Sequence, residues 1–179
     1  AAGITVLLVA GIFTYRYFGS RPAQGVELLS GNEIISDTLP DGSGVFLNRK
    51  TRIRYTADEE EGSRTARLEG EAYFNIHQAA AGSFIVEAGE TLIRDIGTSF
   101  NVKALPGSPT IEVVVDEGEV VFYTSTNPGI HLKAPAKGVY SKSARTFALS
   151  EPDVNATAYK TRSFSFNNDS LVTVVKTLN

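Results

Sequence analysis

The segments LEGEAYFNI at residues 68–76, FIVEAGETLIRDI at 84–96 and GTSFNV at 97–102 decide the fold class. In the first, Ala72, Phe74 and Ile76 alternate with Glu71, Tyr73 and Asn75, and this two-residue period is typical of a strand with one buried face. Three glycines punctuate the short apolar runs: Gly70, Gly89 and Gly97. The spacing predicts four short strands, and no helical period fits it.

The neighbouring sequence continues in the same manner. The segment LPDGS at residues 39–43 predicts a chain reversal, because proline presets one dihedral and glycine accepts a positive φ. Residues 44–55 predict a hairpin around 48–50, and the Glu-Gly-Glu segments at 69–71 and 117–119 predict recurring hairpin turns, with Gly89 and Glu90 as a partial third. We therefore expect one mainly β domain over residues 26–150, built as an antiparallel β-sandwich or β-roll.

Composition narrows the function classes. The chain has 179 residues, with 17 basic and 20 acidic side chains and no cysteine, methionine or tryptophan. That length suits one full domain and a small second one. No basic stripe alternates with aromatic residues, which argues against nucleic-acid binding. Without cysteine there is neither a disulfide framework nor a thiolate metal site.

Residues 1–18 form an apolar run whose first charge is Arg16. As a helix the run would be about 27 Å long, slightly short of a bilayer core, so it predicts part of a transmembrane helix. A secretory signal without its basic front end and a buried helix remain alternatives. Residues 19–25 predict a short linker. A chain that begins inside an apolar run without methionine is expected to be a piece of a longer protein.

The pattern changes over residues 151–179. Alternation predicts a short strand at Ser163, Phe164, Ser165 and Phe166. Asp169 is the expected cap of a following helix, whose apolar face contains Leu171, Val174, Val175 and Leu178. A strand and a helix without a returning strand form an unfinished α/β unit, so we expect it to be truncated here.

Three of these segments together resemble the FecR family of membrane-bound sigma-factor regulators: GEAYF at 70–74, FIVEAG at 84–89 and IGTSFNV at 96–102. The LPDGS turn and the segment at 132–140, which resembles the strand that closes the family's domain, add to the likeness. The resemblance covers roughly residues 39–178. It implies a single-pass inner-membrane protein whose residues after about Gly19 lie in the periplasm. Arg16 and Arg21, taken alone, would favour the opposite orientation.

The function that the resemblance implies is signal transduction by contact. The protein would act as an anti-sigma factor for an extracytoplasmic-function sigma factor, which it would bind through a preceding cytoplasmic part. It would sense the signalling domain of a TonB-dependent receptor, and residues 151–179 would begin a module related to those domains. We expect the receptor to pair with a strand edge at Ser163, Phe164, Ser165 and Phe166. No cofactor is implied.

Catalytic and metal-binding patterns are sparse. His77 and His131 are the two histidines, and neither has a second ligand at a metal-binding interval. An enzyme acting on an external substrate is therefore not expected. Some family members cleave themselves at a Gly-Thr pair, which here corresponds to Gly97 and Thr98. A threonine hydroxyl held against the preceding carbonyl in a strained turn can take over the acyl group. The alternative is that Gly97 allows only a bend between strands.

A second function from another class is an anchored carbohydrate-binding β-sandwich. Glycan grooves use aromatic platforms, and in the absence of tryptophan the candidates are tyrosines: Tyr55, Tyr73, Tyr123 and Tyr140. Such a module would bind soluble glycans without a protein partner.

Overall fold

The computed structural model describes residues 25–58, 62–77, 82–151, 155–167 and 170–178, and its strands form one continuous network of 13 strands, whose two parts are called sheet A and sheet B below. The strands in chain order are β1 (Val26–Leu29), β2 (Ile35–Thr38), β3 (Gly44–Leu47), β4 (Arg52–Asp58), β5 (Ser63–Asn75), β6 (Phe84–Ala88), β7 (Thr91–Asp95), β8 (Ser99–Ala104), β9 (Thr110–Glu117), β10 (Glu119–Thr124), β11 (Ile130–Lys133), β12 (Ala136–Ser141) and β13 (Thr146–Ser150). Two helices follow, α2 (Ala158–Thr161) and α3 (Leu171–Leu178). The mainly β prediction is confirmed.

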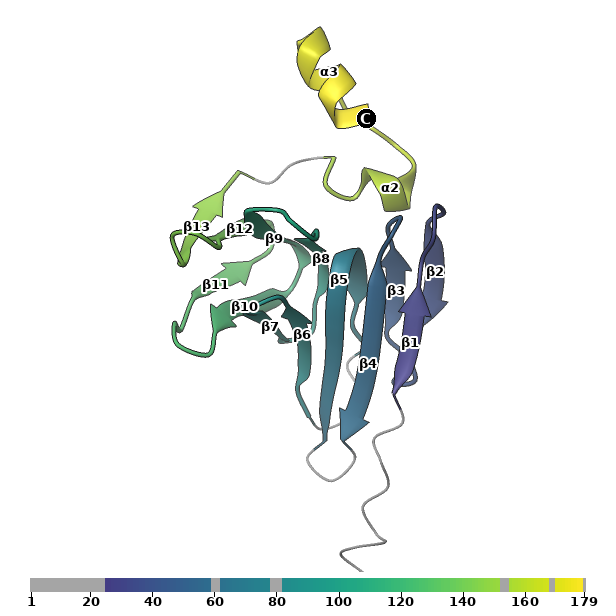
Figure 1. Cartoon of the computed structure of the whole chain (residues 1–179), viewed down its shortest axis with the longest axis vertical. Coiled ribbons are helices and arrows are strands. Elements are labelled where there is room, and N and C mark those ends of the chain that lie inside the picture. The colour runs from purple at the N-terminus through teal and green to yellow at the C-terminus, as the bar shows by residue number, and fades with distance from the viewer. Residues whose placement is uncertain (1–24, 59–61, 78–81, 152–154, 168–169, 179) are drawn as a thin grey trace, which may run out of the picture.

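The long strand β5 organises the fold, because its two halves belong to different sheets. Its first half pairs with β4 and β6, and its second half pairs with β3 and β8. Sheet A has the order β11-β10-β7-β6-β5-β4-β1, and sheet B has the order β2-β3-β5-β8-β9-β12-β13. Figure 1 shows β5 near the middle of the molecule, with the remaining strands curling away on both sides.

Gly70 marks the crossover of β5 between the two sheets, so the predicted turn there is wrong. The chain runs straight through it with φ +117, a conformation that L side chains rarely adopt. The Thr51 backbone lies against this position, and a Cβ added to Gly70 would stand 2.8 Å from the Thr51 Cα. The predicted hairpin turn at Gly89 is confirmed, because it joins the antiparallel neighbours β6 and β7. The predicted hairpin at Gly118 is wrong, because β9 pairs in sheet B and β10 pairs in sheet A, so Gly118 joins two strands that are not partners. The same tripeptide thus serves a crossover at 69–71 and a strand junction at 117–119.

Two further predictions of strand pairing are corrected by the same division into sheets. The expected hairpin at 44–55 does not form, because β3 pairs in sheet B while β4 pairs in sheet A. The expected single strand at 132–140 is likewise two strands, β11 in sheet A and β12 in sheet B. Each connection carries the chain from one sheet to the other, so neighbouring strands in sequence lie on opposite sides of the core.

One pairing departs from the antiparallel prediction. β6 pairs with the first half of β5 in parallel, from Arg64 opposite Phe84 to Leu68 opposite Ala88. Between Asn75 at the end of β5 and Phe84 at the start of β6, the chain has to return to the beginning of β5. Parallel strands require such a return because a tight turn can join only antiparallel neighbours.

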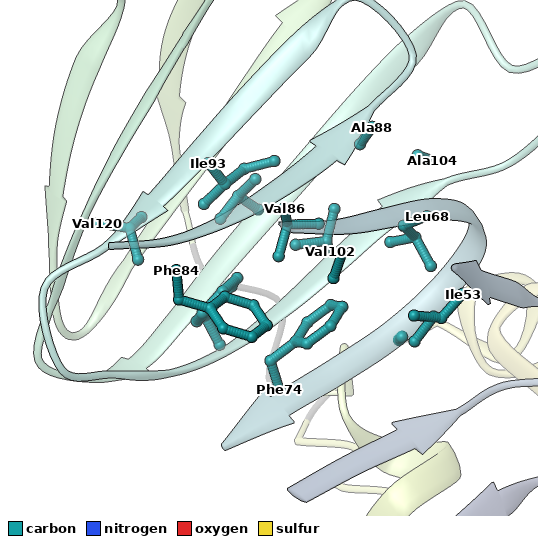
Figure 2. Packing of buried hydrophobic residues seen from close by; sticks show 14 of the residues in the cluster. Ile53, Leu68, Phe74, Phe84, Val86, Ala88, Ile93, Val102, Ala104 and Val120 are labelled. Carbon is teal, nitrogen blue, oxygen red and sulfur yellow. The ribbon is translucent and has the colours of Figure 1, made fainter. Parts of the chain in front are cut away.

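The inner faces of the two sheets enclose one hydrophobic core. Phe74 of β5 stacks on Phe100 of β8 with ring centroids 5.4 Å apart, and it meets Phe84 of β6 edge-on at 6.2 Å. Figure 2 shows the rings of Phe74 and Phe84 among aliphatic side chains of the core, such as Val102. All three rings are almost completely buried. Burial of each such ring stabilises the fold by about 1.5–3 kcal/mol relative to an exposed ring. This cluster therefore fixes the positions of β5, β6 and β8, whose alternate side chains face outward.

The two ends of the chain differ more from the sequence-based expectations. The predicted membrane helix at 1–18 and most of the linker at 19–25 lie outside the described residues, and among those described no helix has the length and apolarity needed to cross a bilayer. The strand predicted at 163–166 does not form, whereas the predicted helix does, as α3. Asp169 lies outside the described residues, and the Ser170 hydroxyl accepts a hydrogen bond from the Thr173 amide at 3.2 Å.

Candidate functional site

A polar and aromatic surface lies on the outer side of sheet B, and we call its four side chains the docking face: Phe46, Glu71, Tyr73 and Asn101. They come from β3, β5 and β8, and their neighbours along each strand point into the core. In register, Phe46 lies opposite Tyr73, and Tyr73 lies opposite Asn101. Strand alternation therefore places them together on one surface.

Three of the four side chains of the docking face are buried and Phe46 is partly exposed, although the sequence pattern predicts a solvent-facing side for Glu71 and Tyr73. The exposed fractions are 7% for Glu71, 4% for Tyr73 and 2% for Asn101. A strand pattern predicts which side a residue faces, but it does not predict what covers that side. Here the cover comes from the segment that follows the β domain.

Glu71 is held by two asparagine side chains. Its carboxylate accepts a hydrogen bond from Nδ2 of Asn48 at 2.9 Å and another from Nδ2 of Asn101 at 3.0 Å. Its backbone is tied to Thr51, whose hydroxyl accepts from the Glu71 amide at 3.0 Å. A buried carboxylate is costly unless its oxygens are hydrogen-bonded, and these amides meet that requirement.

The helix α2 covers the docking face through Tyr159 and Lys160. The Tyr159 hydroxyl donates to Oδ1 of Asn101 at 2.7 Å, which extends the hydrogen-bonded chain from Asn48 through Glu71 to the helix. The Lys160 ammonium stands 3.4 Å from the centroid of the Tyr73 ring and 5.6 Å from that of Phe46. A cation over an aromatic face is attracted by the ring's quadrupole.

The electrostatics of this contact follow from burial. Desolvation, followed by the negative charge of Glu71, raises the pKa of Tyr159 far above its usual value. Desolvation and the nearby Asp116 carboxylate raise the pKa of Tyr73 to about 12. Desolvation lowers the pKa of Lys160, and Asp116 and Glu117 oppose that shift. The two tyrosines are therefore neutral hydrogen-bonding groups near neutral pH.

This arrangement can hold the α2 segment on sheet B, but it offers no free polar group for converting a substrate, because its polar groups already have partners within the protein. Sequence reasoning did not identify Asn101 or Tyr159. An asparagine inside the apolar strand SFNV was a usable signal, since buried polar side chains need partners. For Tyr159 a single sequence carries no such signal, because its contact spans 58 residues.

The predicted self-cleavage pair immediately precedes β8. Gly97 has φ +89, and Thr98 is 4% exposed. The Thr98 hydroxyl donates to Oδ1 of Asp95, whose pKa is raised by desolvation despite the hydrogen bonds from Thr98 and the Gly97 amide. Gly118 packs directly on the Gly97 carbonyl. An acyl shift would need a proton acceptor beside the Thr98 hydroxyl, and the Asp95 carboxylate is one. A bend that only joins two strands would have the same geometry, so self-cleavage stays a prediction.

The predicted partner-binding segment at residues 163–166 has no regular secondary structure and pairs with no strand. The Asn155 side chain bonds both backbone groups of Ser165, accepting from the amide at 2.8 Å and donating to the carbonyl at 3.0 Å. The rings of Phe164 and Phe166 are parallel, with centroids 6.0 Å apart, and Phe164 is 44% exposed. The backbone amide and carbonyl of Ser165 are thus hydrogen-bonded by a side chain in place of a neighbouring strand.

The aromatic platform expected for a carbohydrate-binding module is not present. Tyr55, Tyr73 and Tyr140 are buried, because two fill the core and the third lies under α2. Only Tyr123 of the four is partly exposed. His131 lies 3.0 Å from a Glu119 oxygen, and within the described ranges no group of three metal-ligating side chains comes together.

Comparison with known proteins finds one matching family model and matching solved structures. The family model described as FecR protein matches residues 26–121, which spans β1 to β10. Two crystal structures of a candidate anti-sigma factor from Parabacteroides distasonis ATCC 8503 each match with a TM-score of 0.71 and 27% sequence identity, over 86% of this chain and 73% of theirs. No curated protein matches the sequence.

Proposed function

This chain belongs to the FecR protein family, and from that premise we propose that it is a sigma-factor regulator of the anti-sigma type. The observation that carries the proposal is the match to the Parabacteroides distasonis protein, which extends over 86% of the chain and so reaches beyond the residues of the family model. The regulator would be anchored in the inner membrane, with its β domain in the periplasm, and would respond to a TonB-dependent outer-membrane receptor.

The mechanism that we propose is contact without turnover. The receptor's signalling domain would dock as an extended strand on residues 163–166, where the stacked rings of Phe164 and Phe166 offer an apolar surface. Main-chain hydrogen bonds would supply affinity, and the alternate side chains would supply specificity. The half-exposed ring of Phe164, parallel to that of Phe166, supports this placement because a docked strand could cover both rings.

Purification of the full-length protein from native membranes, with mass spectrometric identification of its partners, tests the proposal. A TonB-dependent receptor and a sigma factor should be recovered together. Recovery of neither with folded, intact protein would refute the proposed function.

A double variant tests the docking segment. Phe164→Asp with Phe166→Asp should lose the receptor and keep the sigma factor. The matched control is Leu149→Asp on β13, which places the same charge at a side chain that is 70% exposed and should keep both partners. Retention of the receptor by the double variant would refute the assignment of the segment.

A further inference from the structure

The helix α2 cannot be stable by itself, so its presence reports a docked state. It has four residues, whereas isolated helices shorter than about 12–15 residues are marginal in water. Three backbone amides donate the hydrogen bonds of this turn: those of Lys160 and Thr161 donate to the Thr157 carbonyl, and that of Arg162 donates to the Ala158 carbonyl. Protection of these amides from exchange therefore depends on the docking face beneath them.

The contact is polar enough to open without disrupting the core. Its closest contacts are the Tyr159 hydroxyl on Asn101 and the Lys160 ammonium on Tyr73, and Ala158 is the one small apolar residue of α2 that is buried. When α2 leaves, water can hydrogen-bond to Asn101 and Glu71. The apolar side chains that hold the two sheets together lie on the inner faces and keep their contacts.

The segment that moves with α2 includes the proposed partner-binding residues. Asn155 bonds both backbone groups of Ser165, and the Thr161 hydroxyl bonds both backbone groups of Ser163 at 3.3 Å. Residues 155–165 are therefore closed into one loop, which we call the clasp, and Tyr159 is the residue by which the clasp is held on sheet B.

A partner strand pairing on the edge of Ser163 and Ser165 competes directly with these side chains. The amide and carbonyl that the strand needs are those that Asn155 and Thr161 occupy. Displacing them opens the loop and removes the geometry that holds Tyr159 over Asn101. A ligand shifts an equilibrium by its difference in affinity for the two states, and an extended partner of this kind favours the open one.

We propose that the clasp is a displaceable unit, and that its release from the docking face by an extended strand of the partner is the conformational step of signalling. This inference rests on the proposed function for the identity of the partner. The docking equilibrium itself belongs to this chain and can be measured without any partner.

Hydrogen exchange of the whole chain tests the docking equilibrium. Tyr159→Phe removes one hydroxyl and leaves Oδ1 of Asn101 without its donor, so the amides of Lys160, Thr161 and Arg162 should exchange about tenfold faster. Amides of β5 and β8 should keep their rates. The matched control is Tyr123→Phe on β10, which should leave both sets unchanged. Unchanged exchange of α2 in Tyr159→Phe and Tyr159→Ala, or equal acceleration of β5 and β8, would overturn the inference.

Transcript sequencing in the native cell separates this inference from the proposed function. We compare a gene deletion, Tyr159→Ala and Tyr123→Phe, with no stimulus added. Tyr159→Ala should change transcripts that the deletion changes, by about twofold or more, and Tyr123→Phe should change none. If the deletion has an effect and Tyr159→Ala has none, the release step is refuted and the proposed function stands. If the deletion has no effect, the proposed function falls, and exchange alone decides whether the clasp opens.

Discussion

Replacing Gly70 with alanine should destabilise the β domain, because both the backbone dihedral of this residue and the close approach of Thr51 oppose a Cβ there. Gly70 has φ +117, and its added Cβ would lie 2.5 Å from Oγ1 and 2.8 Å from Cα of Thr51. The backbone strain contributes about 1–3 kcal/mol. The overpacking against Thr51 contributes about 1–3 kcal/mol more. The free energy of unfolding should therefore fall by about 2–6 kcal/mol if the two effects add.

Urea denaturation followed by far-ultraviolet circular dichroism measures this loss. With a slope of about 2 kcal/mol per molar urea, the midpoint should fall by about 1–3 M. Two control variants separate the causes. Gly107→Ala has φ +76 with nothing within 4 Å of the new Cβ, so it carries only the strain and should lose about 1 kcal/mol. Gly31→Ala has open space and no positive φ, and should change by less than about 0.5 kcal/mol.

The comparison with Gly107→Ala is decisive. If Gly70→Ala lowers the urea midpoint no more than Gly107→Ala does, the close approach of Thr51 does not determine how β5 crosses between the sheets.

Three further predictions address other parts of the molecule. Asp41→Ala should lower the free energy of unfolding by about 3–5 kcal/mol, because it leaves the buried Arg64 guanidinium without its partner at 2.7 Å. The control Glu27→Ala, at an exposed ion pair, should lower it by less than about 1 kcal/mol. Equal losses of the two variants in urea denaturation would contradict this prediction. Because burial raises the pKa of Tyr159 above the usual value of 10.0, its contribution to docking is complete below pH 10 and is lost as the pH rises further. In an ultraviolet titration, Tyr159→Phe should therefore remove one tyrosine from those that ionise at higher pH than a free tyrosine. Loss of a tyrosine that ionises near the usual pKa would contradict this prediction. If self-cleavage occurs at Gly97, intact mass should show two fragments for the wild type and one species for Thr98→Ala, and a single full-length wild-type species would end that hypothesis.

The alternation of apolar residues was sufficient to predict the strands around residues 68–102 and the amphipathic helix at α3. These patterns are local, because a strand or a helix places its side chains by a fixed period. The turn at 39–43 was predictable for the same reason, and the Leu39 amide does bond the Ser43 carbonyl at 2.8 Å. Short contiguous segments also carry the FecR resemblance, so the amino-acid sequence alone is enough to recognise it.

Tertiary structure decided which strands pair and what covers each face. The Glu-Gly-Glu tripeptide is a junction at Gly118 and a crossover at Gly70, and the difference arises from Thr51, which packs on Gly70 from 19 residues earlier in the chain. Burial of Glu71 and Tyr73 depends on Tyr159 and Lys160, which follow the β domain. Contacts between residues so far apart in the chain produce no periodic pattern in the sequence from which they could be predicted. The sequence by itself therefore determined the strands around residues 68–102 and the family, whereas long-range packing alone decided the two-sheet arrangement and the docking of α2.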